Sequence, residues 1–464
     1  MTKNTTRRDF IKALSTGALI TTGSGQLKPF SEVIRSQRKI GPNDTIRVAT
    51  IGMGIIAFYK MESLVQVPGV ELVAVADCYD GRLTRARTVF GDHLETTKKY
   101  SELISRSDID AIVLCVPDHW HSQMAVEALQ AGKHVYVEKP IIQKIEDGHK
   151  IIQAQKASGK VVIVGSQSYR HPLHQKAKEL IKQGAIGQLN VIEAEVSRNN
   201  GIGAWQYTIP SDASPKTIDW DSFLGPAPRR AFDADRFFRW RKFKDYGTGV
   251  SGDMFVHRLT ALHYILDSTG PVQIAATGGL RYWNDGREAP DVLNALLEYP
   301  ETASHPAFTL ILKANFADGS GGGPSLKFIG SEGVIELRSN SLSLRSERRD
   351  EPSFEELLNG YNSARTFAEG QRTAFREEYF RYQSKQAEFD RYDFDKDLEY
   401  TAPQGYDADL DHFMRWTDAI RNEGAVYQNA VVGLRAAAPA IIPNYCLEGK
   451  VYTWNPKEMK MKPM

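Results

Sequence analysis

The sequence is poor in the features that mark several large classes of protein. Its 464 residues include only 3 cysteines, an odd number too small for a disulfide framework. The 58 basic and 57 acidic residues nearly cancel, and no basic arm is present, so nucleic acid is not an expected partner. No apolar run is long enough to span a bilayer, and the histidines lack the spacing of a metal site. We therefore expect no membrane span and no metal.

The first 40 residues form a separate segment. Residues 6–12 (TRRDFIK) precede a mildly apolar, Gly/Thr-rich stretch at residues 13–24, and together they resemble a twin-arginine export signal. A flexible basic tail with a chance arginine pair is the alternative. The signal implies a periplasmic protein that is exported already folded.

Two different patterns follow, as expected for a chain longer than a single core supports. Residues 44–166 alternate near-continuous apolar runs with helical periodicity, which predicts a doubly wound parallel sheet of the Rossmann type. Residues 167–454 show strand-like runs with hairpin-like turns. The whole chain is thus predicted to be α/β, with a Rossmann domain followed by an α+β domain whose sheet is open and mostly antiparallel. Within it, residues 347–404 indicate a peripheral helical insertion.

A G-x-G-x-x-A motif at residues 52–57 follows the first predicted strand. Such a turn lets backbone approach a pyrophosphate at a helix N-terminus. Asp77 ends the second predicted strand, where an acid accepts from the ribose diol and repels a 2′-phosphate, so NAD is favoured over NADP. Arg82 either packs on the adenine or offsets such a phosphate. The residues of the motif expected to bind the cofactor are Gly52, Gly54, Ile55, Ile56 and Ala57.

Two further motifs, residues 115–121 (CVPDHWH) and 138–140 (EKP), lie where predicted parallel strands end, at the edge that opens onto a ligand crevice. With these motifs the chain resembles the Gfo/Idh/MocA oxidoreductases over roughly residues 43–337. The resemblance implies that Glu138 lies by the nicotinamide ribose and that Lys139 reaches the reacting hydroxyl. The residues of the first motif assigned to the cofactor site are Pro117, Trp120 and His121.

Lys139 is a sensible acid/base because burial beside a cationic nicotinamide would lower its pKa. Asp253 and His257 stand four residues apart at the start of a predicted helix, so they share one face. They resemble the family's D-x-x-x-H signature, in which the acid positions a substrate hydroxyl and the histidine assists proton transfer. Phe255 departs from the glycine common in relatives. A helix-start acid and a packed histidine are the alternative.

The stretch between these motifs is expected to supply specificity. The resemblance implies that Gln167 lies near the cofactor and that Arg170 and Arg241 contact the substrate. Polyols are bound by hydrogen bonds from charged groups and by aromatic faces such as Trp205. Packing between domains is an equally good explanation for the aromatic residues.

The resulting hypothesis is an NAD-dependent oxidoreductase that acts on a sugar, polyol or glycoside and forms a homo-oligomer. Lys139, with His257 and Asp253, would take a proton from a ring hydroxyl while the hydride passes to nicotinamide. A glycosidase that uses NAD for transient C3 oxidation and elimination is one alternative. A non-catalytic sugar-binding protein of the same fold is another.

Overall fold

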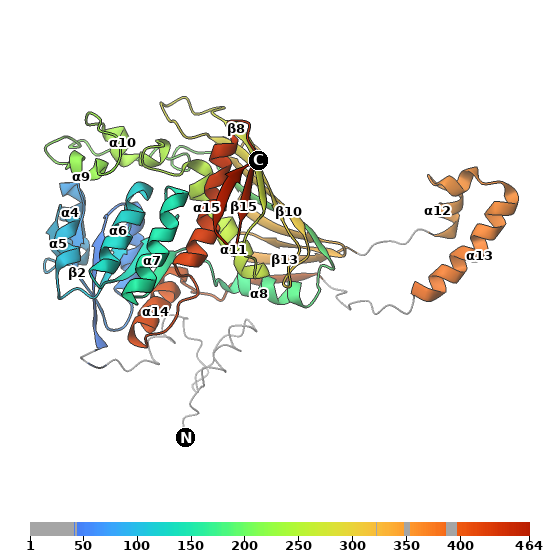
Figure 1. The fold of residues 1–464 in the computed structure, drawn as a ribbon, viewed down its shortest axis with the longest axis horizontal. Helices are drawn as coiled ribbons and strands as arrows, with labels where there is room; N and C mark the ends of the chain where they lie inside the picture. The colour runs from blue at the N-terminus through green and yellow to red at the C-terminus, as the bar shows by residue number, and fades with distance from the viewer. Residues whose placement is uncertain (1–40, 42–43, 322, 348–352, 387–396) are drawn as a thin grey trace, which may run out of the picture.

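The computed structural model describes residues 41, 44–321, 323–347, 353–386 and 397–464. They form two domains side by side, with the first domain's sheet and helices packed against helices that line the second sheet (Figure 1). The proposed export signal lies outside the described residues. In the described part of the chain, no helix is both long and apolar enough to cross a membrane.

The first domain is built on a six-stranded sheet with the order β3-β2-β1-β4-β5-β6, in which every neighbouring pair is parallel. The predicted Rossmann sheet is confirmed. The chain order reverses between β1 and β4, and ligands of doubly wound sheets bind at the carboxyl ends of the strands beside that point. The strands are β1 (Ile46–Ile51), β2 (Val70–Ala76), β3 (Glu95–Thr97), β4 (Ala111–Leu114), β5 (His134–Glu138) and β6 (Val162–Gly165).

Helices from two distant parts of the chain cover this sheet. Five follow its strands: α3 (Ile55–Leu64), α4 (Asp80–Phe90), α5 (Tyr100–Ser105), α6 (Asp118–Gln130) and α7 (Gly148–Ser158). A sixth, α14 (Ala408–Arg421), comes from near the C-terminal end and contacts α3. Its Phe413 stacks on Tyr136 of β5 with ring centroids 4.8 Å apart, and its His412 Nε2 lies 2.9 Å from the carbonyl oxygen of Val164. The predicted assignment of residues 408–421 to the second domain is therefore wrong, because an amphipathic pattern does not show which sheet a helix covers.

The second domain contains a ten-stranded sheet with the order β14-β13-β12-β11-β7-β10-β9-β8-β15-β16. Strands β7 and β10 are parallel, and the other pairs found among the described residues are antiparallel, as predicted. The strands are β7 (Leu189–Ser197), β8 (Gln273–Gly279), β9 (Val292–Tyr299), β10 (Phe308–Asn315), β11 (Ser325–Gly330), β12 (Gly333–Leu337), β13 (Ser341–Ser346), β14 (Leu398–Thr401), β15 (Tyr452–Asn455) and β16 (Lys460–Pro463).

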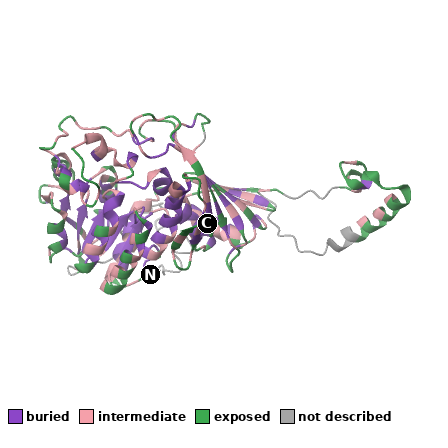
Figure 2. Cartoon of the chain, turned by 45° about the horizontal axis from the view of Figure 1, so that its top comes forward, coloured by how far each residue is buried: buried purple, intermediate pink, exposed green. Residues whose placement is uncertain are grey.

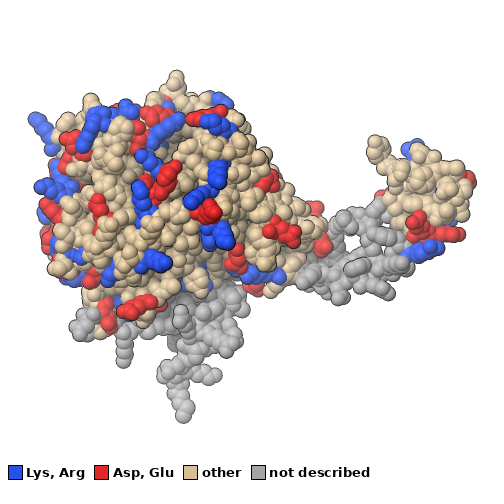
Figure 3. Space-filling model, in the orientation of Figure 1, with Lys and Arg blue, Asp and Glu red and all other residues tan. Residues whose placement is uncertain are grey.

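One face of this sheet is covered and the other is largely open. Helices α11 (Val256–Leu266) and α15 (Ala430–Cys446) lie between the sheet and the first domain, and α8 (Pro172–Lys182) contacts α11 and β13 (Figure 1). Alternate residues of β9 are buried and exposed, and Figure 2 shows buried residues both inside the first domain and on the helices between the two sheets. Basic and acidic side chains are intermixed on the face seen in Figure 3.

Residues 207–246, which we call the strap, leave the second domain and cross the first. The strap contains α9 (Trp220–Leu224), α10 (Ala234–Phe238) and the 3-10 turn Trp240–Lys242. Tyr79 pairs with Ile218 in an isolated antiparallel bridge, and the Tyr79 hydroxyl donates to Asp212 Oδ1 at 2.5 Å. An apolar cluster of Tyr79 with seven strap residues closes the contact: Ile218, Trp220, Phe223, Leu224, Phe237, Phe243 and Tyr246.

The insertion expected at residues 347–404 is helical where the structure describes it, at α12 (Phe354–Asn359), the 3-10 turn Ser363–Thr366 and α13 (Glu369–Gln386). These helices stand away from the two domains in Figure 1. Its last residues differ from the prediction, because β14 adds an edge strand to the second sheet through pairs such as Leu342 with Tyr400.

The packing of α14 generates a stability prediction. Phe413 is fully buried against the first sheet, so Phe413→Ala should lower the free energy of unfolding by about 3–5 kcal/mol through lost burial and a residual cavity. Urea unfolding followed by intrinsic fluorescence measures the change. Tyr361→Ala, at a fully exposed aromatic residue, is the control and should stay within about 0.5 kcal/mol of the parent. Equal effects of the two substitutions would contradict the placement of α14.

Candidate functional site

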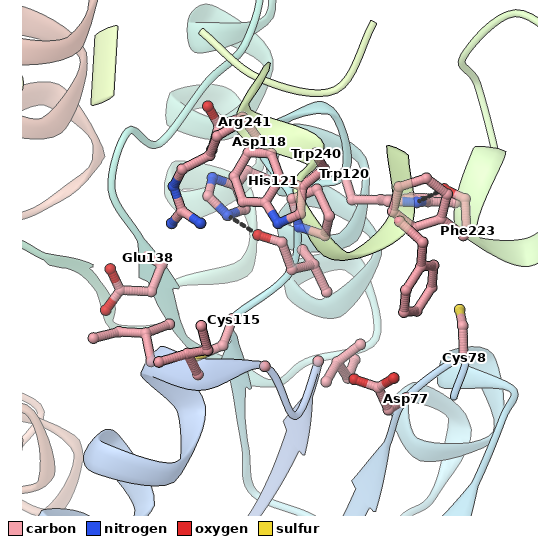
Figure 4. A pocket seen from close by; sticks show the side chains of 18 of the residues that line it. Asp77, Cys78, Cys115, Asp118, Trp120, His121, Glu138, Phe223, Trp240 and Arg241 are labelled. Atoms are coloured by element: carbon pink, nitrogen blue, oxygen red, sulfur yellow. Dashed lines mark hydrogen bonds between the residues drawn. The ribbon is translucent and has the colours of Figure 1, made fainter. Parts of the chain in front are cut away.

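A cavity of about 390 Å³ lies between the two domains, at the carboxyl ends of the parallel strands. Asp77 and Glu138 stand on opposite sides of it, and Trp120 and the strap residue Phe223 lie above Asp77 in the view of Figure 4. The cavity brings together all the predicted site residues except Ala57 and Arg170. Ala57 is fully buried beneath the glycine turn, where its small side chain allows α3 to approach the sheet closely.

The glycine turn has the shape that a dinucleotide needs. Gly52 has φ +87°, and a Cβ atom there would lie 2.5 Å from the carbonyl oxygen of Cys115. At Gly54, by contrast, a Cβ atom would meet nothing within 4 Å among the described residues. Gly54 also forms the N-cap of α3 without a side-chain hydrogen bond to the amides of the first turn. An open helix N-terminus beside free space fits a pyrophosphate.

Asp77 lines the side of the cavity where the sequence predicts the adenosine ribose. Its carboxylate accepts hydrogen bonds from the backbone amides of Met53 at 2.7 Å and Tyr79 at 2.9 Å. Arg82 Nη1 lies 3.4 Å from the same carboxylate, and its guanidinium lies over the rings of Phe237 and Phe238 at 5.2 and 5.3 Å. The backbone contacts fix the acid at the strand end, while the strap supplies an aromatic wall facing it.

The opposite end holds a charged pair that joins the domains. Lys139 Nζ, just after β5, donates to Asp253 Oδ1 at 2.6 Å and to the Asp253 carbonyl at 3.1 Å. Asp253 lies in a π-helical turn, Ser251–Phe255, directly before α11, and such turns are frequent at functional sites. Arg241 Nε of the strap approaches the other Asp253 oxygen at 3.5 Å. The Asp253 carboxylate is thus held between two cations, Lys139 and Arg241. The sequence had predicted a cationic nicotinamide beside Lys139, but not this ion pair.

The electrostatics of this end follow from burial and charge. Burial alone would raise the pKa of Asp253, but the charges of Lys139 and Arg241 outweigh it and hold that pKa well below its ordinary value. Burial and the Lys139 charge lower the pKa of His257 well below its ordinary value. Near neutral pH, Asp253 is therefore ionised and His257 is neutral, so the imidazole has an unprotonated nitrogen able to accept a hydrogen bond.

His121 and Trp120, two predicted residues after β4, form hydrogen bonds with backbone carbonyls around the cavity. His121 places Nδ1 2.6 Å from the Pro140 carbonyl and Nε2 2.9 Å from the Val116 carbonyl, so both ring nitrogens face backbone acceptors. The Trp120 indole donates to the Phe223 carbonyl of the strap at 3.0 Å. Both side chains line the cavity and also hold its walls in place.

Asp118, which also lines the cavity, was not predicted as a site residue. Its Oδ2 accepts from the amide and hydroxyl of Thr248 at 2.9 and 2.8 Å, and burial raises its pKa. Asp118 thus joins the start of α6 to residues 247–249 (GTG), which precede the π-helical turn that contains Asp253. Its position directly after a strand end was a signal that could have found it.

The wall formed by the residues that follow β7 includes one predicted and two unpredicted residues. Trp205 is fully buried and meets Phe316 edge to face, with centroids 5.0 Å apart. Its Nε1 has no hydrogen-bond partner in the described chain. Arg198 and Tyr207 line the same wall, but the irregular stretch that carries them has no periodic pattern from which to predict their direction.

Arg170 does not reach this cavity, contrary to the substrate contact predicted for it. It lines a second cavity of about 530 Å³ and lies over the Tyr427 ring at 4.7 Å. The turn after β6 directs it toward the segment that follows α14, and the sequence does not show that this segment lies there. Gln167 lines both cavities.

Comparison with solved structures shows that the fold is a known one. The aldose-aldose oxidoreductase from Caulobacter crescentus aligns with a TM-score of 0.60 at 16% identity, over 88% of this chain and 99% of that one. A levoglucosan dehydrogenase, solved with NADH and levoglucosan, aligns with a TM-score of 0.60 at 15% identity, over 90% and 99% of the two chains.

Curated sequences give closer but shorter matches. A glycosyl hydrolase family 109 protein from Shewanella baltica is 28% identical over 211 residues, and one from Shewanella sp. strain W3-18-1 is 31% identical over 210 residues. Each match covers 40% of this chain and 44% of the relative, so the chain spans less than half the length of these relatives.

Family models match both domains in chain order. Residues 46–166 match the oxidoreductase family model for the NAD-binding Rossmann fold, and residues 173–281 match the model for the C-terminal alpha/beta domain. The cavity lies between the two matched domains. The chain therefore belongs to the Gfo/Idh/MocA family of oxidoreductases, with an NAD-binding Rossmann domain before its α/β domain.

Proposed function

We propose that the protein uses NAD to oxidise a hydroxyl group of a sugar, polyol or glycoside. The observation that carries this proposal is the Lys139–Asp253 pair, 2.6 Å apart, at one end of a cavity whose other end has the glycine turn and Asp77. The first end offers proton-transfer groups and the second offers a dinucleotide site.

Lys139 and His257 are the residues that would move the proton. Lys139 Nζ is fixed by Asp253, and its side chain is 12% exposed, so a ligand in the cavity can reach it. His257, near the start of α11, lines the same cavity, and its neutral imidazole would assist the transfer by accepting a hydrogen bond from the reacting hydroxyl. Asp253 and Arg241 orient these groups, and bound NAD would supply the hydride acceptor.

The residues that follow β7 favour a polyhydroxylated substrate. The Trp205 side chain lines the cavity, and aromatic faces of this kind pack on the C–H patches of sugars. Arg198 and Arg241 add charged donors to the same cavity. The levoglucosan dehydrogenase and the aldose-aldose oxidoreductase with this fold carry sugar substrates in their names, in line with this proposal.

The glycosidase remains a second candidate, favoured by a specific observation. The curated relatives with matches of about 210 residues are glycosyl hydrolase family 109 proteins. In that reaction NAD would be used transiently, to oxidise C3 so that the C2 proton becomes acidic and the leaving group is eliminated. The same Lys139, Asp253 and His257 cluster would serve the oxidation step.

We also propose that the protein is exported to the periplasm by residues 1–40, in line with the TRRDFIK motif at residues 6–12. The homo-oligomer stays a prediction; exposed Leu296 and Ile311 on the open face of the second sheet are compatible with it.

A substrate panel separates the candidate functions. Sugars, polyols and aryl glycosides are incubated with the protein and NAD, and reduced nicotinamide and free aglycone are measured together. Net reduction identifies a dehydrogenase, whereas aglycone release without net reduction identifies the glycosidase. A protein that binds these compounds but produces neither signal contradicts the enzymatic proposal and supports the sugar-binding alternative.

Lys139→Met should lower kcat about 10²- to 10⁴-fold, because it removes a proton-transfer group while keeping the length of the side chain. Steady-state kinetics on the active substrate measure the change. Lys144→Met is the matched control, since Lys144 is exposed a few residues along the same loop, and it should leave kcat unchanged. Unchanged turnover in Lys139→Met would remove Lys139 from the proposed chemistry.

A periplasmic NAD enzyme would need a resident cofactor, because free NAD is scarce there. The strap closes the adenosine side of the cavity with Phe223, Phe237 and Phe238, which supports slow release. We expect denaturation of extensively desalted protein to release a near-equimolar amount of nicotinamide dinucleotide, measured by chromatography and mass spectrometry. The flow-through of undenatured protein is the control, and a supernatant without nicotinamide would count against a resident cofactor.

A further inference from the structure

Lys60 is a buried lysine at the edge of the cofactor cavity that the proposed chemistry does not use. It belongs to α3, its side chain is fully buried, and it lines the cavity. Its Nζ lies 3.6 Å from Glu138 Oε1 and makes its closest contact with Asp409 Oδ1 of α14. One lysine thus stands between two carboxylates, one facing the cavity and one from a helix near the C-terminal end.

Glu138 is held on several sides. The Tyr136 hydroxyl donates to Glu138 Oε1 at 3.0 Å, and the Lys139 amide approaches Oε2 at 3.3 Å. A Cβ atom on Gly165 would lie 2.6 Å from Oε1, so glycine is needed there to leave room for the carboxylate. These contacts occupy mainly Oε1, and Oε2 is the oxygen with capacity left for a ligand hydroxyl.

Stability alone does not explain this arrangement. Two carboxylates and a lysine taken out of water carry a desolvation cost that their attraction often fails to repay. Burial lowers the pKa of Lys60, but Glu138 and Asp409 outweigh it and raise that pKa overall. Burial raises the pKa of Asp409, although Lys60 opposes the effect. A charged Lys60 at this depth therefore depends on both acids.

Lys60 lies closer to Asp409 than to Glu138. Asp409 takes the close contact, and the ammonium stays 3.6 Å from Glu138. Without Asp409, Lys60 would have Glu138 as its only carboxylate partner among the described ion pairs, and the two would close into a direct pair. That movement would shift the Glu138 carboxylate from the position it now has in the cavity wall.

We propose that Asp409, acting through Lys60, is a positioning residue that keeps the Glu138 carboxylate available to the cofactor. The inference rests on the proposed NAD site. It adds that α14, a helix distant in sequence from that site, influences the affinity for NAD through Asp409. Asp409 itself does not line the cavity, so it touches neither cofactor nor substrate directly.

Direct binding of NAD and NADH to cofactor-free protein, measured by fluorescence titration or calorimetry, tests this proposal without relying on turnover. Asp409→Asn keeps the shape of the side chain and removes its charge, and it should weaken binding of both forms roughly tenfold or more, the worth of a lost charge-assisted hydrogen bond. In a Lys60→Met background, Asp409→Asn should have little further effect, because the link between the two acids is already gone.

Asp411→Asn is the matched control. Asp411 lies on the same helix, two residues away, and pairs with Arg415 at 3.0 Å beside the second cavity. It should bind NAD like the parent. Tyr136→Phe tests the same carboxylate without a change of charge, by removing the hydrogen bond that the Tyr136 hydroxyl donates to Glu138 Oε1, and should weaken binding severalfold even if Lys60→Met fails to fold.

The binding measurements distinguish failure of the proposed NAD-dependent function from failure of the role proposed for Asp409. A parent protein that binds neither NAD nor NADH would refute the proposed function itself. If the parent binds, this inference is overturned by Asp409→Asn with parental affinity, by an equal loss in Asp411→Asn, by an undiminished Asp409→Asn effect in the Lys60→Met background, or by parental affinity in Tyr136→Phe.

Discussion

The ion pair of Lys139 with Asp253 is the contact on which the site depends. Lys139 follows a strand of the first domain, Asp253 begins a helix of the second, and both are largely removed from water. A buried pair of this kind is strongly unfavourable when either partner is lost. The two domains must therefore meet in the orientation that closes the pair. Arg241 and the Asp118–Thr248 contact are arranged around that requirement.

The sequence was sufficient to predict the first sheet and most of the cofactor half of the cavity. The reason is geometric: parallel strands end at one edge, so motifs that follow successive strands, such as residues 52–57 and 138–140, must converge. The second sheet was also predictable in kind, because alternation and turns are local signals. Residues 408–421 were assigned to the wrong domain, since their pattern shows a helix but not its partner.

Side-chain direction in irregular segments was the part that could not be predicted. Arg170 and Gln167 come from the same turn, yet Arg170 reaches only the second cavity. Arg198 and Tyr207 lie where no helical or strand period relates one side chain to the next. The Lys60–Asp409 contact joins residues 349 positions apart, and no local pattern links them. Asp118, in contrast, followed a strand end and could have been found.

The return of α14 to the first sheet has a consequence for how the protein is made. Strand β5 and helix α3 are synthesised about 270 residues or more before the Phe413 ring that packs on that strand and the Asp409 carboxylate that contacts Lys60. The first domain therefore cannot reach its final packing while most of the chain is still being synthesised. A chain that stopped before α14 would leave exposed the face of the first sheet that Phe413 covers, and Lys60 would lack its closest carboxylate partner.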